Sequence, residues 1–158
     1  MSFTIDNNDI IGHEGVVQRL WAALETGRVH QAYLFEGPKG LGKATLALHF
    51  AMAANCKNMP RPCRTCDSCR QIAEGNHPDV WIVNPEGART ESISVAQIRE
   101  VVRKVGYHRY SARRRVVIID PAEAMNPTAA NALLKTLEEP PEATGFILVT
   151  HQSDALLP

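Results

Sequence analysis

Short apolar runs alternate with helical patterns along the chain. Four runs are rich in β-branched or aromatic residues and bounded by turn residues, as is typical of buried strands: 32–36 (AYLFE), 80–83 (VWIV), 116–120 (VVIID) and 146–150 (FILVT). Apolar residues recur at helical spacing, or helix formers follow one another without a breaker, at about 13–26, 43–55, 94–105 and 127–139. Alternating strands and helices predict βαβ units, and hence an α/β fold with a parallel sheet flanked by helices.

A glycine-rich turn joins the first predicted strand to the helix that follows it. Its sequence is that of a phosphate loop, Gly-x4-Gly-Lys, in the expected context: Gly37, Pro38, Lys39, Gly40, Leu41, Gly42 and Lys43. The glycines let backbone N–H groups point into one concavity, the helix N-terminus adds partial positive charge, and the lysine reaches the terminal phosphates. We therefore expect a nucleotide-binding loop; a tight turn with a surface lysine is the alternative.

Two further positions bear on this nucleotide site. The residue after the lysine should carry a hydroxyl that holds magnesium, but it is Ala44, and the hydroxyl comes one place late at Thr45. A helix turns about 100° per residue, so Thr45 does not simply replace it. Asp120 ends an apolar strand and is placed to hold a metal-bound water at the carboxyl end of that strand.

Four cysteines lie within one short segment. Their spacing is Cys56-x6-Cys63-x2-Cys66-x2-Cys69, and Pro60 and Pro62 keep the chain between the first two out of a helix. Four thiolates suit tetrahedral zinc, which would be structural because no coordination position stays open. Free buried cysteines and a redox or iron–sulfur site are the alternatives, and His77 is a possible substitute for one thiolate.

Charge and composition narrow the class of protein. Lys and Arg number 17, as do Asp and Glu, so the net charge predicts no general attraction to nucleic acid or to an anionic membrane. Basic residues gather between 99 and 115, and we interpret them as a solvated face, with a local DNA or subunit contact as the alternative. No secretory signal and no apolar stretch of ~18 residues is present. We expect a soluble, cytoplasmic protein.

Three segments carry a resemblance to a known family. They are 10–20 (IIGHEGVVQRL), 29–43 (VHQAYLFEGPKGLGK) and 129–141 (AANALLKTLEEPP). Together they resemble the bacterial clamp-loader subunits of DNA polymerase III, the gamma/tau and delta-prime proteins of the AAA+ class. The four cysteines sit where that family inserts a zinc module, so the resemblance covers nearly the whole chain.

The resemblance implies an architecture and a set of partners. We expect residues 1–158 to form one AAA+ nucleotide-fold domain with a zinc module at 56–69, the lid and collar domains lying outside the chain. The implied sheet has five parallel strands in the order 5-1-4-3-2, with the fifth beyond Pro158. The implied partners are the gamma/tau and delta subunits of a hetero-pentamer, which opens the sliding clamp and places it on primed DNA.

The family also divides into hydrolysing motors and a rigid stator. Motors follow the strand-end aspartate with a glutamate, but here Pro121 takes that place, and we expect Glu123 to point elsewhere. With Ala44, this favours a non-hydrolysing stator for which binding of ATP and magnesium stays open. A hydrolysing motor subunit and a zinc-dependent nucleic-acid-binding module are the alternatives. Thr150 matches the family's phosphate sensor, or is an ordinary strand-end threonine.

Overall fold

The computed structural model describes residues 14–38, 42–59, 61–86, 91–107 and 113–151. Its strands are β1 (Ala32–Glu36), β2 (Val80–Val83), β3 (Arg115–Ile119) and β4 (Thr144–Thr150). Its helices are α1 (Glu14–Thr26), α2 (Lys43–Asn55), α3 (Asp67–Glu74), α4 (Val95–Val105) and α5 (Pro127–Glu138), with a 3-10 turn, η1, at Ala122–Ala124. Among the described residues, no helix is long and apolar enough to cross a membrane.

The four strands form one parallel sheet in the order β1-β4-β3-β2. β4 therefore lies between the first and third strands, with Ile147 aligned to Ile118 on one side and to Tyr33 on the other. The predicted parallel α/β fold is confirmed, and the order agrees with that implied for the four strands within the chain. All four carboxyl ends meet at one edge, the usual ligand-binding edge of such a sheet.

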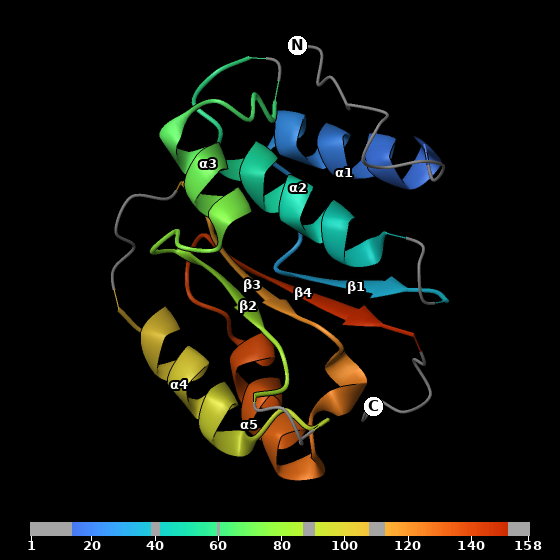
Figure 1. Cartoon of the computed structure of the whole chain (residues 1–158), viewed down its shortest axis with the longest axis vertical. Helices are drawn as coiled ribbons and strands as arrows, with labels where there is room; N and C mark the ends of the chain where they lie inside the picture. Colours follow the sequence, from blue (N-terminus) through green and yellow to red (C-terminus); the bar gives the residue numbers. More distant parts are fainter. Residues whose placement is uncertain (1–13, 39–41, 60, 87–90, 108–112, 152–158) are drawn as a thin grey trace.

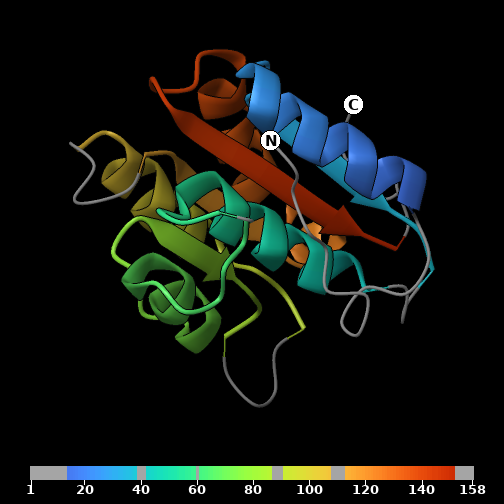
Figure 2. The same cartoon turned by 90° about the horizontal axis from the view of Figure 1, so that it is seen from above.

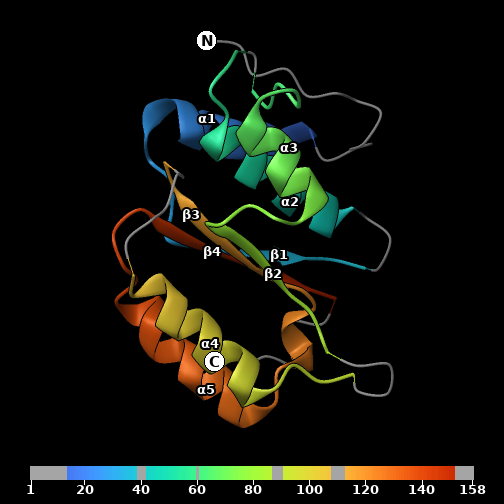
Figure 3. The same cartoon turned by 60° about the vertical axis from the view of Figure 1, so that its left-hand side comes forward.

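Helices cover both faces of the sheet. α1, α2 and α3 lie on one face, and α4 and α5 on the other (Figures 1 and 3). Seen from above in Figure 2, α1 and α2 run side by side over the strands. Val116 and Ile118 of β3 pack with the first layer and Val117 and Ile119 with the second. This burial on both faces explains why the β3 sequence is continuously apolar instead of alternating, and each such side chain contributes about 1.5–3 kcal/mol.

Local capping sets the start of two helices. Ser94 accepts a hydrogen bond from the Gln97 backbone N–H, and the Gln97 side chain accepts one from the Ser94 N–H, forming a capping box at α4. Asn126 caps α5 through a single hydrogen bond, which its side-chain oxygen accepts from the Ala129 N–H, and Pro127 takes the first helical position.

Helix α3 was not predicted from the sequence, because its residues were assigned to the cysteine segment as a whole. Only Cys69 and Ile72 provide buried apolar side chains in its eight residues, too few for a recognisable helical repeat. The Cys66 sulfur caps it by accepting from the Cys69 N–H, and Gly75, with φ +79°, ends it. Part of the cysteine segment is therefore a regular helix.

One basic residue of the 99–115 stretch lies in the core. Arg115 is 2% exposed, donates to the Val105 carbonyl at 2.8 Å, and pairs with Asp79 at 3.5 Å. Its guanidinium also lies 5.3 Å from the centre of the Trp81 ring. The interpretation of the whole stretch as a solvated face is wrong for Arg115, which joins β3, β2 and α4. Residues 108–112 lie outside the described part of the chain.

Candidate nucleotide and metal sites

The phosphate loop lies between β1 and α2, at the carboxyl edge of the sheet (Figure 1). The Gly37 N–H donates to the Thr150 carbonyl at 3.2 Å, which ties the start of the loop to the end of β4. Gly42 precedes α2 with φ +80°, a conformation that side-chain-bearing residues rarely adopt. Residues 39–41, which include Lys39, Gly40 and Leu41, lie outside the described part of the chain.

The Lys43 amine contacts the backbone of the phosphate loop itself. It donates to the carbonyl oxygens of Gly37 and Pro38, the latter at 2.8 Å, and lies 2.8 Å from Nδ1 of His151. The lysine is half-buried at the first position of α2. A cation at a helix N-terminus, beside a glycine-rich turn, is suited to a phosphate group.

The hydroxyl expected for magnesium is absent from its usual position. Ala44, the second residue of α2, is exposed and presents only a methyl group, while Thr45 is half-buried one position later. The residues at this loop therefore suit a phosphate better than they suit a hydrated magnesium ion.

Asp120 follows β3 directly and lies among the charged groups of the site. Its backbone N–H donates to the Val83 carbonyl at 2.9 Å. The pKa of the Asp120 carboxyl is raised, mainly by burial and also by the nearby charge of Glu123. The positive charges of His151 and Lys43 offset part of this rise. Asp120 and Lys43 therefore lie close enough to interact electrostatically, and their role in nucleotide binding stays a prediction.

Glu123 also belongs to this group, so the prediction that it points elsewhere is wrong. Its Oε1 accepts a hydrogen bond from the His151 backbone N–H at 3.1 Å, and its carboxylate bonds the side chain of Thr150. Burial raises the pKa of Glu123, but these hydrogen bonds outweigh it and lower the pKa. The cause is the turn η1, which directs the chain after Pro121 back to the end of β4.

Of the two residues at the end of β4, the sequence predicted Thr150 but not His151. Thr150 was predicted because it matches the phosphate-sensor position of the resembled family, and the structure buries it fully beside Glu123. His151 was missed, because a histidine just after a strand has no distinctive sequence pattern. The only available signal was its position next to Thr150, at the carboxyl end of a parallel strand.

The four cysteine side chains come together beyond the C-terminal end of α2, where Cys56 caps that helix. Cys56 follows α2, Cys63 and Cys66 lie in the segment that precedes α3, and Cys69 is in α3. Their sulfurs all lie within 4.8 Å of one another, and none forms a disulfide. Zinc–sulfur bonds of about 2.3 Å in a tetrahedron need sulfurs about 3.8 Å apart, so a small closure of this cluster would hold a zinc ion.

Backbone N–H groups point at the sulfurs. Cys63 N–H donates to Cys56 Sγ and Cys66 N–H to Cys63 Sγ, both at 3.2 Å, and Cys69 N–H donates to Cys66 Sγ at 3.5 Å. Although burial raises the pKa of Cys63, hydrogen bonds from Thr65 and Cys66 lower it to about 5. Burial raises the pKa of Cys69. The hydrogen bonds thus favour the metal-binding thiolate at Cys63 and Cys66, whose pKa values are lowered, whereas burial also raises the pKa of Cys56.

His77 does not join the cysteine cluster. Its Nδ1 accepts from the Asp79 N–H at 3.0 Å, and the residue is 3% exposed. Burial lowers the pKa of His77, which favours the neutral ring. Among the described residues, the cluster that could bind a metal ion therefore consists of the four cysteines and does not include His77.

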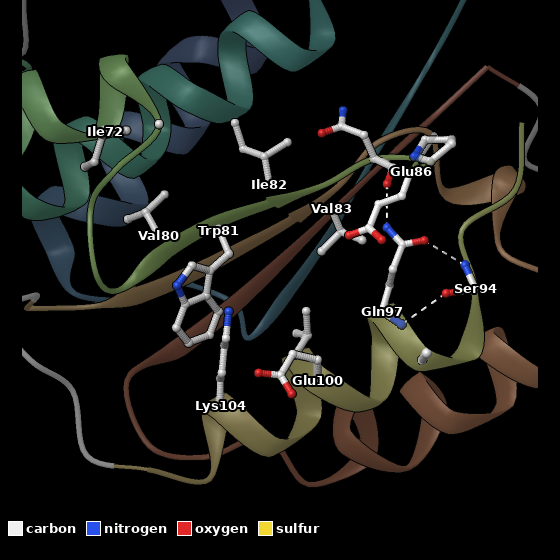
Figure 4. Close-up of a pocket in the computed structure, with 15 residues that line it drawn as sticks. Ile72, Val80, Trp81, Ile82, Val83, Glu86, Ser94, Gln97, Glu100 and Lys104 are labelled. Atoms are coloured by element: carbon white, nitrogen blue, oxygen red, sulfur yellow. Dashed lines mark hydrogen bonds between the residues drawn. The ribbon is translucent and has the colours of Figure 1, made fainter. Parts of the chain in front are cut away.

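A groove of about 670 Å³ lies at another place, along the outer side of β2 (Figure 4). Trp81 and the exposed Ile82 come from the strand, and Glu100 and Lys104 come from α4. The Lys104 amine stands 5.3 Å from the centre of the Trp81 ring. The groove shares no residue with the phosphate loop or with the cysteine cluster.

Comparison with known proteins identifies relatives of this chain. Residues 12–158 match the model of a family described as DNA polymerase III, delta subunit. The chain is 43% identical over 144 residues to DNA polymerase III subunit delta' of Pseudomonas aeruginosa, and 38% identical over 143 residues to that of Bacillus subtilis. It is 38% identical over 144 residues to DNA polymerase III subunit tau of Escherichia coli.

These matches cover most of the chain but only part of each relative. They span 89%, 90% and 90% of this chain, against 44%, 43% and 22% of the respective relatives. The chain therefore spans less than half the length of these proteins. A solved structure, a gamma subunit-related protein of Thermotoga maritima, has a TM-score of 0.67 at 27% identity, over 88% of this chain and 41% of that one.

Proposed function

Since the chain belongs to the DNA polymerase III delta-subunit family, we propose that it acts as a subunit of the clamp loader, of the delta-prime type. In this role it helps to place the sliding clamp on primed DNA in the cytoplasm, assembled in a hetero-pentamer with gamma/tau and delta subunits. The names of the matched relatives support a place in the DNA polymerase III holoenzyme.

The subunit is a non-hydrolysing stator. Pro121, which follows Asp120 just after β3, is the observation that carries this proposal, because proline has no side chain able to orient an attacking water beside Asp120. Ala44 supports it, because its methyl group offers no ligand to magnesium. Loss of two such groups lowers hydrolysis by orders of magnitude.

The hydrolysing motor is the second candidate, and one observation favours it. Lys43, Asp120 and Thr150 still converge at the carboxyl edge of the sheet, where ATP would lie. The same groups also suit a bound nucleotide that is not turned over. The two candidates therefore differ in turnover and not in the position of the site.

The four cysteines hold a structural zinc ion in this proposal. The sulfurs are close together, and backbone N–H groups of Cys63, Cys66 and Cys69 donate to them, which favours the thiolate at Cys63 and Cys66. Zinc bound by four thiolates keeps no position for a substrate, so its role is to hold α3 against α2.

The test uses the full-length subunit assembled with the other loader subunits, the clamp and primed DNA. ATP turnover and clamp loading are compared for the wild type and Lys43→Ala. We expect both rates to stay within about twofold, because a stator does not hydrolyse ATP. As a matched control, the corresponding lysine is replaced in a subunit with a complete phosphate loop, where turnover should fall strongly. A comparable fall for Lys43→Ala, with assembly intact, would restore the motor.

A further inference from the structure

Two hydrogen-bond donors at the end of β4 are directed at a carboxylate of the same chain. The Thr150 hydroxyl and the His151 backbone N–H both bond Glu123, the second at 3.1 Å. Thr150 is fully buried, and its carbonyl accepts from the Gly37 N–H, where the phosphate loop starts. These donors therefore stand next to the place where the phosphates of a nucleotide would lie.

A carboxylate and a phosphate are competitors for such donors. Both present anionic oxygens that accept charge-assisted hydrogen bonds, and one donor does not serve both fully. The charges compete as well, because Glu123 already interacts with Asp120 within this site. A third anionic group placed beside two carboxylates is disfavoured, although Lys43 and His151 offset part of the repulsion.

We propose that Glu123 is a specificity-determining residue that excludes the terminal phosphate of a nucleoside triphosphate from this site. Its carboxylate takes the place of that phosphate on Thr150 and on the His151 N–H. A nucleoside diphosphate needs the phosphate loop and not these two donors, so Glu123 opposes it less. The inference rests on the proposed function and gives the non-hydrolysing site a preference for the diphosphate.

One feature of Glu123 fits a rival role. Its Oε2 is enclosed and has no hydrogen-bond partner among the residues that the structure describes. An acceptor of this kind would also suit a carboxylate that orients an attacking water, in place of Pro121. The rival role predicts loss of turnover with unchanged binding, whereas exclusion of the phosphate predicts a change in binding.

The experiment measures the affinity of the full-length subunit for fluorescent ATP and ADP analogues, with magnesium, for the wild type and Glu123→Gln. Removing the charge should strengthen ATP binding relative to ADP by about ten- to a hundredfold, the range expected of a charge-assisted hydrogen bond. The ratio of the ATP affinity to the ADP affinity is measured on one protein sample of each variant, so a partly inactive preparation does not change this ratio. Glu123→Ala, which removes the whole carboxyl group, is the second variant and should move the ratio the same way.

Glu142→Gln is the matched control, because it removes the same charge from an exposed residue in the turn before β4, at the opposite end of that strand. It should leave the ratio unchanged. An unchanged ratio for both Glu123 variants overturns the inference, as does the absence of detectable binding of either nucleotide to them, because something other than Glu123 then excludes nucleotide.

ATP turnover by the assembled loader distinguishes a failure of the Glu123 inference from a failure of the proposed stator function. If Glu123→Gln abolishes turnover at an unchanged ratio, Glu123 orients water, and both the inference and the stator are wrong. If Lys43→Ala lowers turnover while the Glu123 ratio shifts as expected, only the stator is wrong.

Discussion

Backbone N–H groups of one short segment donate hydrogen bonds to the cysteine sulfurs, and single residues of this segment have more than one role. Cys66 has two roles: its sulfur is a candidate metal ligand, and it caps α3 by accepting from the Cys69 N–H. Serine is a strong helix cap but a poor zinc ligand. Replacing Cys66 by serine therefore separates the two roles, because the cap is kept and the thiolate is lost.

We predict that Cys66→Ser loses zinc and destabilises the domain. If the metal contributes about 3 kcal/mol, the melting temperature should fall by about 6–12 °C. Metal analysis of the purified protein and thermal denaturation check the two effects. Met59→Ser, a change at a 45% exposed residue of the same segment, is the control and should keep both zinc and stability. Unchanged metal content in Cys66→Ser would rule out the four-thiolate site.

At the nucleotide site, the sequence predicted the residues whose neighbours in the chain identify them. Lys43 lies in a glycine-rich loop, Asp120 ends an apolar run, and Thr150 matches the sensor position of the resembled family, so each could be placed at the carboxyl edge of a parallel sheet. Glu123 could not be placed in this way, because its direction depends on the turn η1 after Pro121. Short irregular turns are set by tertiary contacts that no periodic pattern records.

Among the elements, the helices with local start signals were the most predictable. α4 begins at the capping box of Ser94 and Gln97, whose hydrogen bonds join residues three apart and so can be read from a short stretch. α3 lacked a recognisable pattern because only Cys69 and Ile72 give it buried apolar side chains. α3 begins among the cysteines. Their spacing predicts a metal site but does not predict that a helix starts there.

We predict that Ser94→Ala lowers the free energy of unfolding by about 1 kcal/mol, because the Gln97 backbone N–H in the first turn of α4 loses its acceptor. Ser92→Ala is the matched control: this exposed serine lies two residues earlier, outside the helix, and its loss should change stability by less than about 0.5 kcal/mol. Chemical denaturation of the three proteins measures the difference. Equal stabilities of the two variants would mean that the capping box does not hold α4.

Across the whole molecule, the sheet divides the apolar residues into two cores with different dependence on the cysteine cluster. Cys56 and Cys69 are fully buried members of the core under α1, α2 and α3. The Trp21 indole N–H donates to the Arg61 carbonyl at 3.2 Å, which joins α1 to the cysteine segment. The core under α4 and α5 contains none of the cysteines.

Removal of the metal should therefore loosen one layer before the other. We predict that chelation of zinc from the full-length protein speeds hydrogen exchange in α1, α2 and α3 by about tenfold or more, with little change in α4 and α5, because local opening follows the contacts that are lost. Hydrogen-exchange mass spectrometry of the metal-bound and chelated protein measures this. The Cys66→Ser protein should already show the chelated pattern and should not respond to the chelator. Equal acceleration in both layers would mean that the domain opens as a single unit, and no acceleration would mean that the cluster does not support the first core.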